Sequence, residues 1–416
     1  MRKNRIYISL ILLSLKNVFR NFKRSTLTFL CISIGMSAFL IVTGLIYGIE
    51  TQSIKNYIET RVAHIKIYKQ GYFEDISILP LDKTLNYNSS ELQKLKNNNY
   101  NFCLRILFSA NLIIGEYELP CIAAGIDFNN DKKIFKIINS IITKNFDNKD
   151  GYKKIYIGID IANLFKLKIG DIITITSRTK YGTINADDFI IAGFVNTGNP
   201  EIDNFYLFIN INEARVFLDL ANDEVTEISM IVDDYSIEKI EKVKKDLRNI
   251  LGNNYRINGW YDEIKDVLNF FEFRRRARLL ISMLLLILAS VGVINTMLMS
   301  VFERMQEIGT LMALGMSKKK IIFLFISEGA IIGLLGGFFG AIIGGIIVWY
   351  FKKYGIDISS LTGFNINVPI KTYIYAYLPI RYYFLSILYG LVLSMFVSFF
   401  PAFRASKFNP SEILRK

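Results

Sequence analysis

The chain has 416 residues, 51% of them hydrophobic, and a formal net charge of +13 at pH 7. The excess of basic residues lies in three short segments, 1–24, 303–320 and 404–416, whereas the long polar segment 50–278 contains 31 basic and 32 acidic residues. Because each basic segment adjoins an apolar run, the charge is typical of membrane flanks, and we expect no nucleic-acid partner.

Four apolar runs are long enough to cross a membrane. About 20 apolar residues span the hydrocarbon core as a helix, and the runs 25–49, 279–302, 321–351 and 382–403 reach that length with at most one charged residue each. Core helices of soluble proteins rarely stay uncharged for so long. We therefore predict four transmembrane helices, and the positive-inside rule places both termini and 303–320 in the cytoplasm.

The segment 1–24 precedes the first predicted span. Leu12, Leu15, Phe19 and Phe22 recur there at helical spacing beside lysine and arginine residues. This pattern predicts an amphipathic helix on the inner leaflet, although an ordinary basic lead to the first span explains it equally well. The basic lead and the apolar run are both too long for a cleaved signal peptide.

The segment 50–278 is predicted to fold as an α+β domain outside the membrane. Stretches such as AHIKIYKQG, in which Ile65 and Ile67 alternate with polar residues, predict strands. Helical stretches do not alternate with the strands strictly enough for a doubly wound sheet. Cys103 and Cys121 could form a disulfide or remain free thiols.

No sequence motif in the chain indicates chemistry. The single histidine, His64, has no clustered ligands, and the chain lacks CxxC, HExxH, GxSxG and the phosphate-binding pattern GxxxxGK(S/T). We therefore predict no catalytic residue, no metal site and no cofactor bound by this chain. The external domain is interpreted as a binding or mechanical module.

The third predicted span contains glycines at the four-residue spacing that lets helices approach closely in lipid. This ridge is predicted to join helices either within one subunit or between two. Its residues are Gly333, Gly336, Gly337, Gly340 and Gly344.

Two charged features adjoin the spans. Glu328 is the only acidic residue in the four runs, and we expect a structural anchor that reaches the interface or Lys318–Lys320, with transport coupling as the alternative. Arg274–Arg278 marks the outer end of the second span, where it is expected to bind lipid headgroups. A grip on the external domain is the alternative interpretation of these arginines.

The stretch ERMQEIGTLMALGMSKKK, residues 303–320, predicts a short cytoplasmic amphipathic helix that ends near Gly315. With its neighbours in 294–345 it resembles the permease module shared by FtsX, MacB and the lipoprotein-releasing LolC and LolE proteins. The tail FPAFRASKFNPSEILR (400–415) resembles the end of that module. In the external segment, IGIDIANLFKLKIGDIITI resembles the LolC/LolE branch most closely.

The resemblance implies the permease subunit of an ABC transporter of the LolC/LolE type. Such a subunit forms a homodimer or heterodimer with a second permease subunit and works with a LolD-like ATPase dimer, which uses ATP-Mg. The stretch 303–320 would be the coupling helix that contacts the ATPase. The contacts implied are Glu303, Arg304, Glu307, Ile308, Gly309, Leu314 and Gly315.

The resemblance also implies that lipoprotein cargo leaves the inner membrane between the first and second spans, for a LolA-like periplasmic carrier and the outer membrane. The carrier would contact the hairpin at 176–188 through Arg178 and Lys180. This hairpin is short and lacks the extended hook of LolC, so the chain looks more like LolE or like a permease that forms homodimers. The sequence does not decide among LolC-like, LolE-like and homodimeric roles. From depth and helix face, the predicted lining of the cargo cavity is Phe39, Leu40, Thr43, Ile46, Tyr47, Ile281, Leu284 and Leu285.

Two other roles compete with lipoprotein release. One is an FtsX-like mechanotransmission subunit that regulates an extracytoplasmic cell-wall hydrolase, and the other is a MacB-like efflux permease. The sequence leaves open which cargo is handled and whether the chain transports or only transmits force.

The predicted architecture is an α-helical membrane protein with four transmembrane helices and an α+β MacB-core-like domain, with Porter-like and Sabre-like parts, on the periplasmic side of the inner membrane. The predicted boundaries are 1–24 for the cytoplasmic N-terminal helix, 25–49 for the first span, 50–278 for the periplasmic domain, 279–302 for the second span, 303–320 for the coupling helix, 321–351 for the third span, 352–381 for a short periplasmic loop, 382–403 for the fourth span and 404–416 for the cytoplasmic tail.

Overall fold

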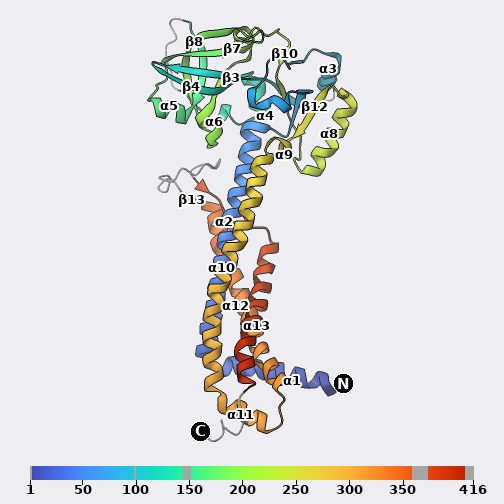
Figure 1. The fold of residues 1–416 in the computed structure, drawn as a ribbon, viewed down its shortest axis with the longest axis vertical. Helices are drawn as coiled ribbons and strands as arrows, with labels where there is room; N and C mark the ends of the chain where they lie inside the picture. Colours follow the sequence, from blue (N-terminus) through green and yellow to red (C-terminus); the bar gives the residue numbers. More distant parts are fainter. Residues whose placement is uncertain (1, 98–99, 144–150, 358–372, 408–416) are drawn as a thin grey trace. The chain divides into compact units, whose positions relative to one another are not determined.

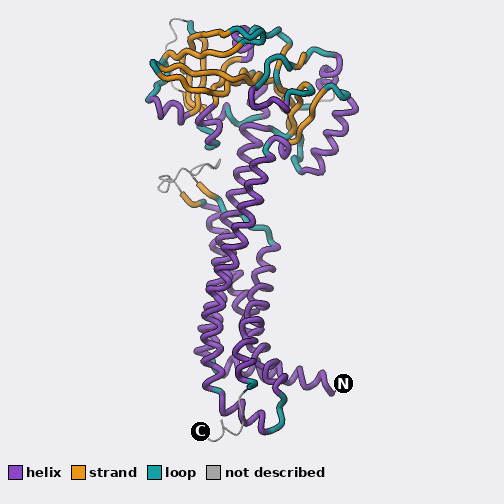
Figure 2. The backbone as a smooth tube through the Cα atoms, viewed as in Figure 1, coloured by secondary structure: helices purple, strands orange, loops and turns teal. Residues whose placement is uncertain are grey.

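The computed structural model divides into two compact units. Figure 1 labels the helices and strands, and Figure 2 shows that one unit is mainly helical whereas the other contains most of the strands. Among the described residues, the membrane unit comprises 2–51, 271–357 and 373–407, and the α+β unit lies within 52–270. The residues described are 2–97, 100–143, 151–357 and 373–407.

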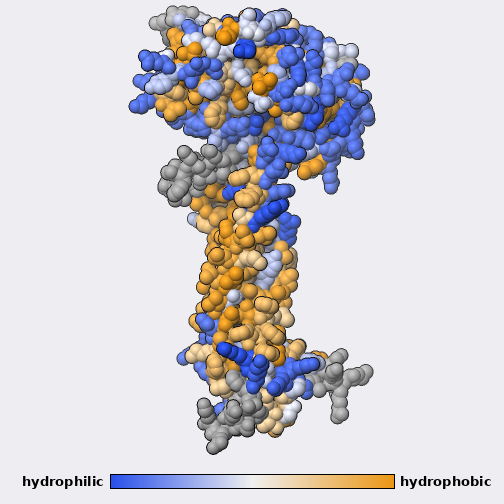
Figure 3. Space-filling model, viewed as in Figure 1, coloured by the Kyte–Doolittle hydropathy of each residue, from blue (hydrophilic) through white to orange (hydrophobic). Residues whose placement is uncertain are grey.

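The membrane unit contains all or part of six helices among the described residues. Four of them, α2, α10, α12 and α13, are long and apolar enough to cross a membrane, and hydrophobic residues cover them in Figure 3. Each contains one predicted span and extends beyond it at both ends. The bounds are α1 Arg2–Arg20, α2 Phe22–Tyr57, α10 Lys265–Glu303, α11 Met305–Ala313, α12 Lys318–Tyr354 and α13 Arg381–Ala405, with a small hairpin of β13 Ile356–Asp357 and β14 Tyr373–Ile374.

Helix α12 packs closely on α2 and on α13 through the predicted glycine ridge. A Cβ added to Gly340 would lie 2.7 Å from the Met36 Cβ, and one added to Gly333 would lie 2.5 Å from the Gly390 carbonyl oxygen. The ridge has two edges: Gly336, Gly340 and Gly344 face α2, whereas Gly333 and Gly337 face α13. In this structure the ridge therefore joins helices within one chain, which is one of the two predicted arrangements.

The α+β unit is organised around one ten-stranded mixed sheet. Its strand order is β12-β1-β11-β3-β4-β9-β6-β8-β5, and β7 pairs with both β3 and β8. Most neighbouring strands are antiparallel, whereas the pairs β4–β9 and β6–β8 are parallel. The predicted α+β class is confirmed in this coarse form, because strands and helices do not alternate regularly along the chain.

The elements of this unit have the following bounds. The strands are β1 Ile65–Lys69, β2 Leu85–Asn86, β3 Asn101–Ile114, β4 Tyr117–Ile126, β5 Ile141–Thr143, β6 Lys153–Gly158, β7 Ile172–Arg178, β8 Ile184–Val195, β9 Tyr206–Asn210, β10 Glu224–Val225, β11 Glu227–Ile231 and β12 Tyr255–Gly259. The helices are η1 Ile58–Val62, η2 Phe73–Ile78, α3 Ser90–Asn97, α4 Phe128–Ile134, η3 Ile138–Ser140, α5 Ile159–Phe165, α6 Pro200–Phe205, α7 Ile211–Phe217, α8 Ile237–Leu251 and α9 Trp260–Glu263.

One π-helical turn joins helix α2 to strand β1. This turn, η1 (Ile58–Val62), follows α2 directly and is the wide form of a helix, in which each bond spans five residues. Ala63 then takes φ +53°, a conformation that is uncommon for residues other than glycine. Strand β1 begins two residues later, so the turn sets which side chains of β1 point to each face of the sheet.

The two faces of the sheet differ in chemistry. Ile65 and Ile67 of β1 belong to the large apolar cluster, together with Ile106 of β3. The intervening residues point to the other face, where Lys66 and Arg105 are only 3% and 2% exposed. One face is therefore a hydrophobic core, whereas the other combines buried charge with a second, smaller apolar cluster.

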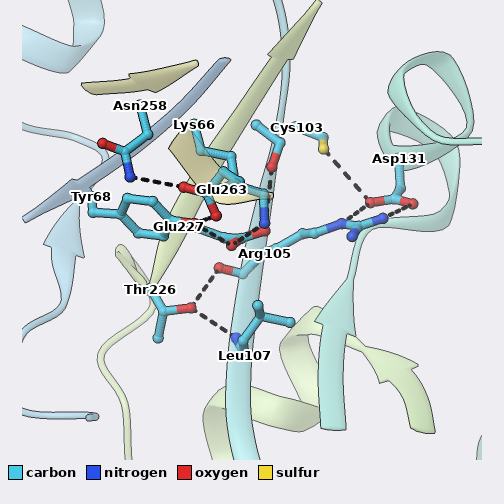
Figure 4. Close-up of polar contacts among 11 residues, drawn as sticks. Lys66, Tyr68, Cys103, Arg105, Leu107, Asp131, Thr226, Glu227, Asn258 and Glu263 are labelled. Atoms are coloured by element: carbon cyan, nitrogen blue, oxygen red, sulfur yellow. Dashed lines mark hydrogen bonds and ion pairs between the residues drawn. The ribbon is translucent and has the colours of Figure 1, made fainter. Parts of the chain in front are cut away.

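Ion pairs neutralise this buried charge (Figure 4). Lys66 Nζ lies 2.7 Å from a carboxylate oxygen of Glu227 on β11. Arg105 donates from Nε and Nη2 to the two oxygens of Asp131 on α4, at 2.7 and 2.9 Å. The charged face thus connects strands β1, β3 and β11 with helix α4.

Glu263, the last residue of α9, joins the same polar layer (Figure 4). Its carboxylate accepts hydrogen bonds from the Tyr68 hydroxyl at 3.0 Å and from Asn258 Nδ2 at 2.9 Å. Burial raises the pKa of Glu263, and the nearby Lys66 charge opposes that rise. The layer therefore ties α9 to the edge strand β12 and to its neighbour β1.

Both cysteines of this unit are free and buried. Cys121 belongs to the large apolar cluster and Cys103 to a second cluster on the opposite face of the sheet. Because their side chains point to opposite faces, the two thiols do not meet. Of the two predicted alternatives, a disulfide or free thiols, the structure therefore shows free thiols.

The variant Lys66→Met is expected to lower the free energy of unfolding by about 3–5 kcal/mol, because it leaves the Glu227 carboxylate buried without its counter-charge. The double variant Lys66→Met/Glu227→Leu should recover most of that loss. Chemical denaturation of the full-length protein, followed by Trp260 fluorescence in a Trp349→Phe background, would measure both.

The matched control is Lys239→Met, which removes an exposed lysine 3.8 Å from Asp234. Its cost should not exceed about 1 kcal/mol. If the double variant Lys66→Met/Glu227→Leu is as unstable as Lys66→Met alone, the loss of stability does not come from the unpaired Glu227 carboxylate.

Candidate functional site

Helix α11 lies between the second and third spans and is bounded by two breaks. Helix α10 ends at Glu303, Arg304 takes φ −101° and ψ 16°, and α11 begins at Met305. At its other end Gly315 adopts φ +91° and donates its N–H to the Met312 carbonyl. A glycine ends this turn because other residues rarely adopt that conformation.

A buried ion pair holds the start of α11 against α12. Arg304 donates from Nη1 to both carboxylate oxygens of Glu328, at 2.9 Å each. The two side chains are 9% and 6% exposed, and the guanidinium carbon lies 5.5 Å from the centroid of the Phe325 ring. Arg304 Nε also donates to Glu307 at 3.1 Å, so one arginine bridges the two helices.

Two predictions are wrong at this point. The partners of Glu328 are Arg304 and Asn17, whose Nδ2 donates at 2.7 Å, and not Lys318–Lys320. Arg304 itself is predicted to contact an ATPase, yet its guanidinium is buried inside this chain. The physical reason is desolvation, because a carboxylate buried among helices requires a charged donor at close range.

The N-terminal helix belongs to the same ionic network. Arg20 of α1 donates to both oxygens of Glu307 at 2.7 Å, and Arg24 at the start of α2 forms an ion pair with Glu303. These contacts and that of Asn17 are not evident from the sequence, because 287 residues separate Arg20 from Glu307. The available signal was charge: basic residues of one amphipathic helix face two glutamates of another.

Only part of the predicted coupling set is exposed. Ile308 is 2% exposed and packs with Ile321 and Phe325 of α12, and Gly309 is also buried. Leu314, in contrast, is 80% exposed at the end of α11. The exposed members of the set are Glu303, Glu307, Leu314 and Gly315. Gln306 and Thr310 share this exposed side, and the prediction omitted them.

The structure does not bring the predicted cargo-cavity residues together. Phe39, Leu40 and Thr43 are 6%, 0% and 1% exposed. Phe39 packs edge-to-face against Tyr389 of α13, with ring centroids 5.6 Å apart. The prediction is wrong for these three residues, because this face of α2 packs on α12 and α13.

The other predicted cavity residues are partly or fully exposed. Ile281 and Leu284 of α10 are 47% and 58% exposed. Ile46, Tyr47 and Leu285 are half-buried.

Helix α2 contacts α10 through a different face. A Cβ added to Gly35 would lie 2.7 Å from the Ala289 Cβ, and the hydroxyl of Thr28 donates to that of Thr296 at 2.8 Å.

At the other end of α10, Arg278 pairs with Glu50 of α2. The closest nitrogen and oxygen are 3.9 Å apart, and both side chains are 6% exposed. The Arg278 guanidinium lies 5.6 Å from the centroid of the Tyr47 ring. A headgroup anchor is therefore the wrong interpretation of Arg278, whereas Arg275 and Arg276 of the same cluster are exposed.

The β7–β8 hairpin contains the two residues predicted to contact a carrier. Arg178, the last residue of β7, is exposed. Lys180 is engaged within the chain, since its Nζ lies 2.6 Å from Glu224 and its backbone N–H donates to the Leu218 carbonyl. Of the two, Arg178 is the better placed for an external contact.

Residues 279–410 match the FtsX-like permease C-terminal family, and the sequence 294–345 lies within that match. The chain belongs to the FtsX-like permease superfamily. It is 24% identical to the lipoprotein-releasing system transmembrane protein LolC of Xylella fastidiosa (strain 9a5c), over 74% of this chain and 76% of that protein. It is 26% identical to LolC of Buchnera aphidicola subsp. Schizaphis graminum (strain Sg), over 95% of this chain and 94% of that protein.

The chain is thus an ABC transporter permease of the FtsX, LolC and MacB family. Among solved structures, the periplasmic region of MacB from Actinobacillus actinomycetemcomitans is 14% identical and covers 52% of this chain and 97% of its own, with a TM-score of 0.34. At that TM-score the match adds nothing to the fold of the permease described above.

A double-mutant cycle on this permease, with Arg304→Met and Glu328→Gln, is expected to give a coupling free energy of about 1–3 kcal/mol. The same cycle on the exposed pair Arg20–Glu307, whose side chains are 56% and 49% exposed, should give less than about 1 kcal/mol. Unfolding of the full chain in detergent micelles measures both. A coupling near zero for the buried pair would mean that it does not hold α11 in place.

Proposed function

We propose that this permease is the transmembrane subunit that releases lipoproteins from the inner membrane to a periplasmic carrier, for delivery to the outer membrane. A separate LolD-like ATPase dimer would hydrolyse ATP-Mg, and a second permease subunit would complete the complex. The observation that carries the proposal is the ionic network at α11, where Arg304 pairs with Glu328 of α12 and Arg20 of α1 pairs with Glu307. Similarity to LolC proteins supports lipoprotein as the cargo.

The network gives α11 the properties of a coupling helix. One side of α11 is buried against α12, and Glu307 on the opposite, exposed side links the helix to Arg20 of α1. Because separating a buried ion pair costs several kcal/mol, a partner that displaces α11 moves α12 and α1 with it. Leu314 and Glu307, on the exposed side, would contact the ATPase.

The cargo would enter between the outer halves of α2 and α10. The pair Glu50–Arg278 joins these helices there, and it would separate when they part. Its separation of 3.9 Å makes it a weaker contact than the pair near α11. The contacts proposed for the cargo are Ile46, Tyr47, Ile281, Leu284 and Leu285.

The α+β unit would work in the periplasm, with both termini of the chain in the cytoplasm. We assign it to the MacB-core type, with Porter-like and Sabre-like parts, and Arg178 would contact the carrier. An FtsX-like role with a cell-wall hydrolase and a MacB-like efflux role would use the same coupling at α11. Identification of the cargo separates these roles.

The variant Leu314→Asp is expected to weaken binding of the ATPase at least about tenfold and to abolish ATP-driven release, because it puts a charge on an exposed apolar contact. Co-purification of the ATPase and release of lipoprotein from proteoliposomes measure the two effects. If both survive, α11 is only a linker.

Charge reversal at Glu303 and Glu307 should also uncouple hydrolysis from release, but it breaks their pairs with Arg24 and Arg20 as well. The exchange variant Glu303→Lys/Arg24→Glu keeps an internal pair. It therefore isolates the contribution of Glu303 to the ATPase contact.

A photoreactive amino acid at Ile46 is expected to capture a lipoprotein, whereas the same group at Phe39 should not, because Phe39 is buried against Tyr389. Crosslinking in membranes that contain the whole complex, followed by mass spectrometry, provides the measurement. Consistent capture of a small molecule from Ile46 would favour efflux, and recovery of a murein hydrolase with the complex would favour the FtsX-like role.

A further inference from the structure

The α+β unit contains a cavity of about 440 Å³ at one edge of its sheet. It lies where two adjacent parallel strands, β4 and β9, reach their carboxyl ends at Ile126 and Asn210. In open α/β sheets ligands bind beyond the carboxyl ends of parallel strands, and the parallel pair β4–β9 presents such ends at this cavity. The residues that matter for the argument are Tyr87, Phe102, Asp127, Asn130, Asn212 and Arg215.

Arg215 supplies a buried positive charge to this cavity. Its residue surface is only 7% exposed. Nη1 donates to the Asn212 side-chain oxygen at 2.9 Å and Nε to the Glu224 backbone carbonyl at 3.4 Å, so both acceptors are neutral. A guanidinium carries five N–H donors, and within the described part of the chain these two bonds are its hydrogen bonds.

No ion pair in the described residues involves Arg215, in contrast to the buried Arg105 with Asp131. Burial lowers the pKa of Arg215, and the charges of Tyr87 and Asp223 offset that only in part. A buried charge without a counter-ion is unfavourable. An anion in the cavity would therefore find a charged donor that is already positioned and desolvated.

The rest of the cavity favours a singly charged, partly apolar anion. The Tyr87 ring centroid lies 5.6 Å from the guanidinium carbon, and Phe102 adds an apolar wall. The two oxygens of Asp127 already accept from the Asn129 N–H and from Asn130 Nδ2. Because the acidic side chain of Asp127 also lines the cavity, a phosphate dianion is disfavoured and a carboxylate fits better.

We propose that this cavity binds a carboxylate-bearing ligand, held by Arg215 and packed against Tyr87 and Phe102. The carboxylate could belong to the C-terminus of a peptide or to a small organic acid, since both present the same planar group to the guanidinium. The inference is independent of lipoprotein release and of the coupling at α11.

The test uses full-length protein in lipid nanodiscs and isothermal titration calorimetry. The probes are benzoate, the peptide Ala-Ala-Phe with a free C-terminus, and the same peptide amidated. We expect the two carboxylate probes to bind and the amidated peptide to bind at least about tenfold more weakly. Tighter binding of the free peptide than of benzoate identifies a peptide C-terminus as the ligand, and the reverse identifies a small acid.

The variant Arg215→Gln should weaken binding of the preferred probe at least about tenfold. Arg248→Gln, which removes an exposed arginine of α8 outside the cavity, is the matched control and should leave binding unchanged. Arg215→Lys keeps the charge and loses the planar fork, so it should give an intermediate loss. If thermal melting shows that Arg215→Gln does not fold, the binding measured for Arg215→Lys tests the role of Arg215 instead.

Three results would overturn the proposal. The wild-type protein could bind neither carboxylate probe, it could bind the amidated peptide as tightly as the free one, or the Arg215 variants that fold could bind like the wild type. Each of these outcomes leaves the ATPase and lipoprotein experiments unaffected, so failure here is distinguishable from failure of the proposed function.

Discussion

The cytoplasmic side of this permease is organised by the need to satisfy one buried carboxylate. An acidic side chain among apolar helices is unfavourable unless charge and hydrogen bonds reach it at close range. Glu328 receives Arg304 from the break between α10 and α11, and Asn17 from α1. Because the same arginine also contacts Glu307, the positions of α1, α11 and α12 depend on one another. The coupling proposed for α11 follows from this dependence.

The α+β unit uses buried charge in two different ways. On the polar face of its sheet, Lys66 and Arg105 each have a carboxylate within 3 Å, so charge there fixes strands and helices to one another. In the described part of the chain Arg215 has only neutral acceptors. The paired charges of Lys66 and Arg105 stabilise the fold, whereas the charge of Arg215 is left without a counter-ion among the described residues. Only such an unpaired buried charge gives a ligand a gain in free energy on binding.

Hydropathy predicts the four spans well, because membrane length and lack of charge are properties of the sequence alone. It does not predict which face of a helix meets which neighbour. Phe39 and Ile46 lie on an apolar helix that touches several others, and only the packed structure shows that Phe39 faces α13. Arg304 illustrates a second limit of prediction from sequence. A charged residue next to a span is interpreted as a surface residue unless its buried partner is known, and here that partner is Glu328. The strand in AHIKIYKQG was correctly predicted at Ile65 and Ile67. Lys66, however, lies in a buried polar layer and not in solvent.

The π-helical turn η1 makes the residue count between α2 and β1 a structural parameter in its own right. A π-turn accommodates one residue more than an α-helical turn does, and strands alternate their side chains with a period of two. Loss of a single residue from Ile58–Val62 would be absorbed, because the turn would relax to an ordinary helical turn and strand β1 would keep its register. Loss of Ala63 or His64, which lie between the turn and β1, would have no such reserve. Ile65 and Lys66 would then exchange faces, placing a lysine in the apolar cluster and an isoleucine beside Glu227. In this short segment the length of the chain therefore carries as much information as the identity of its residues.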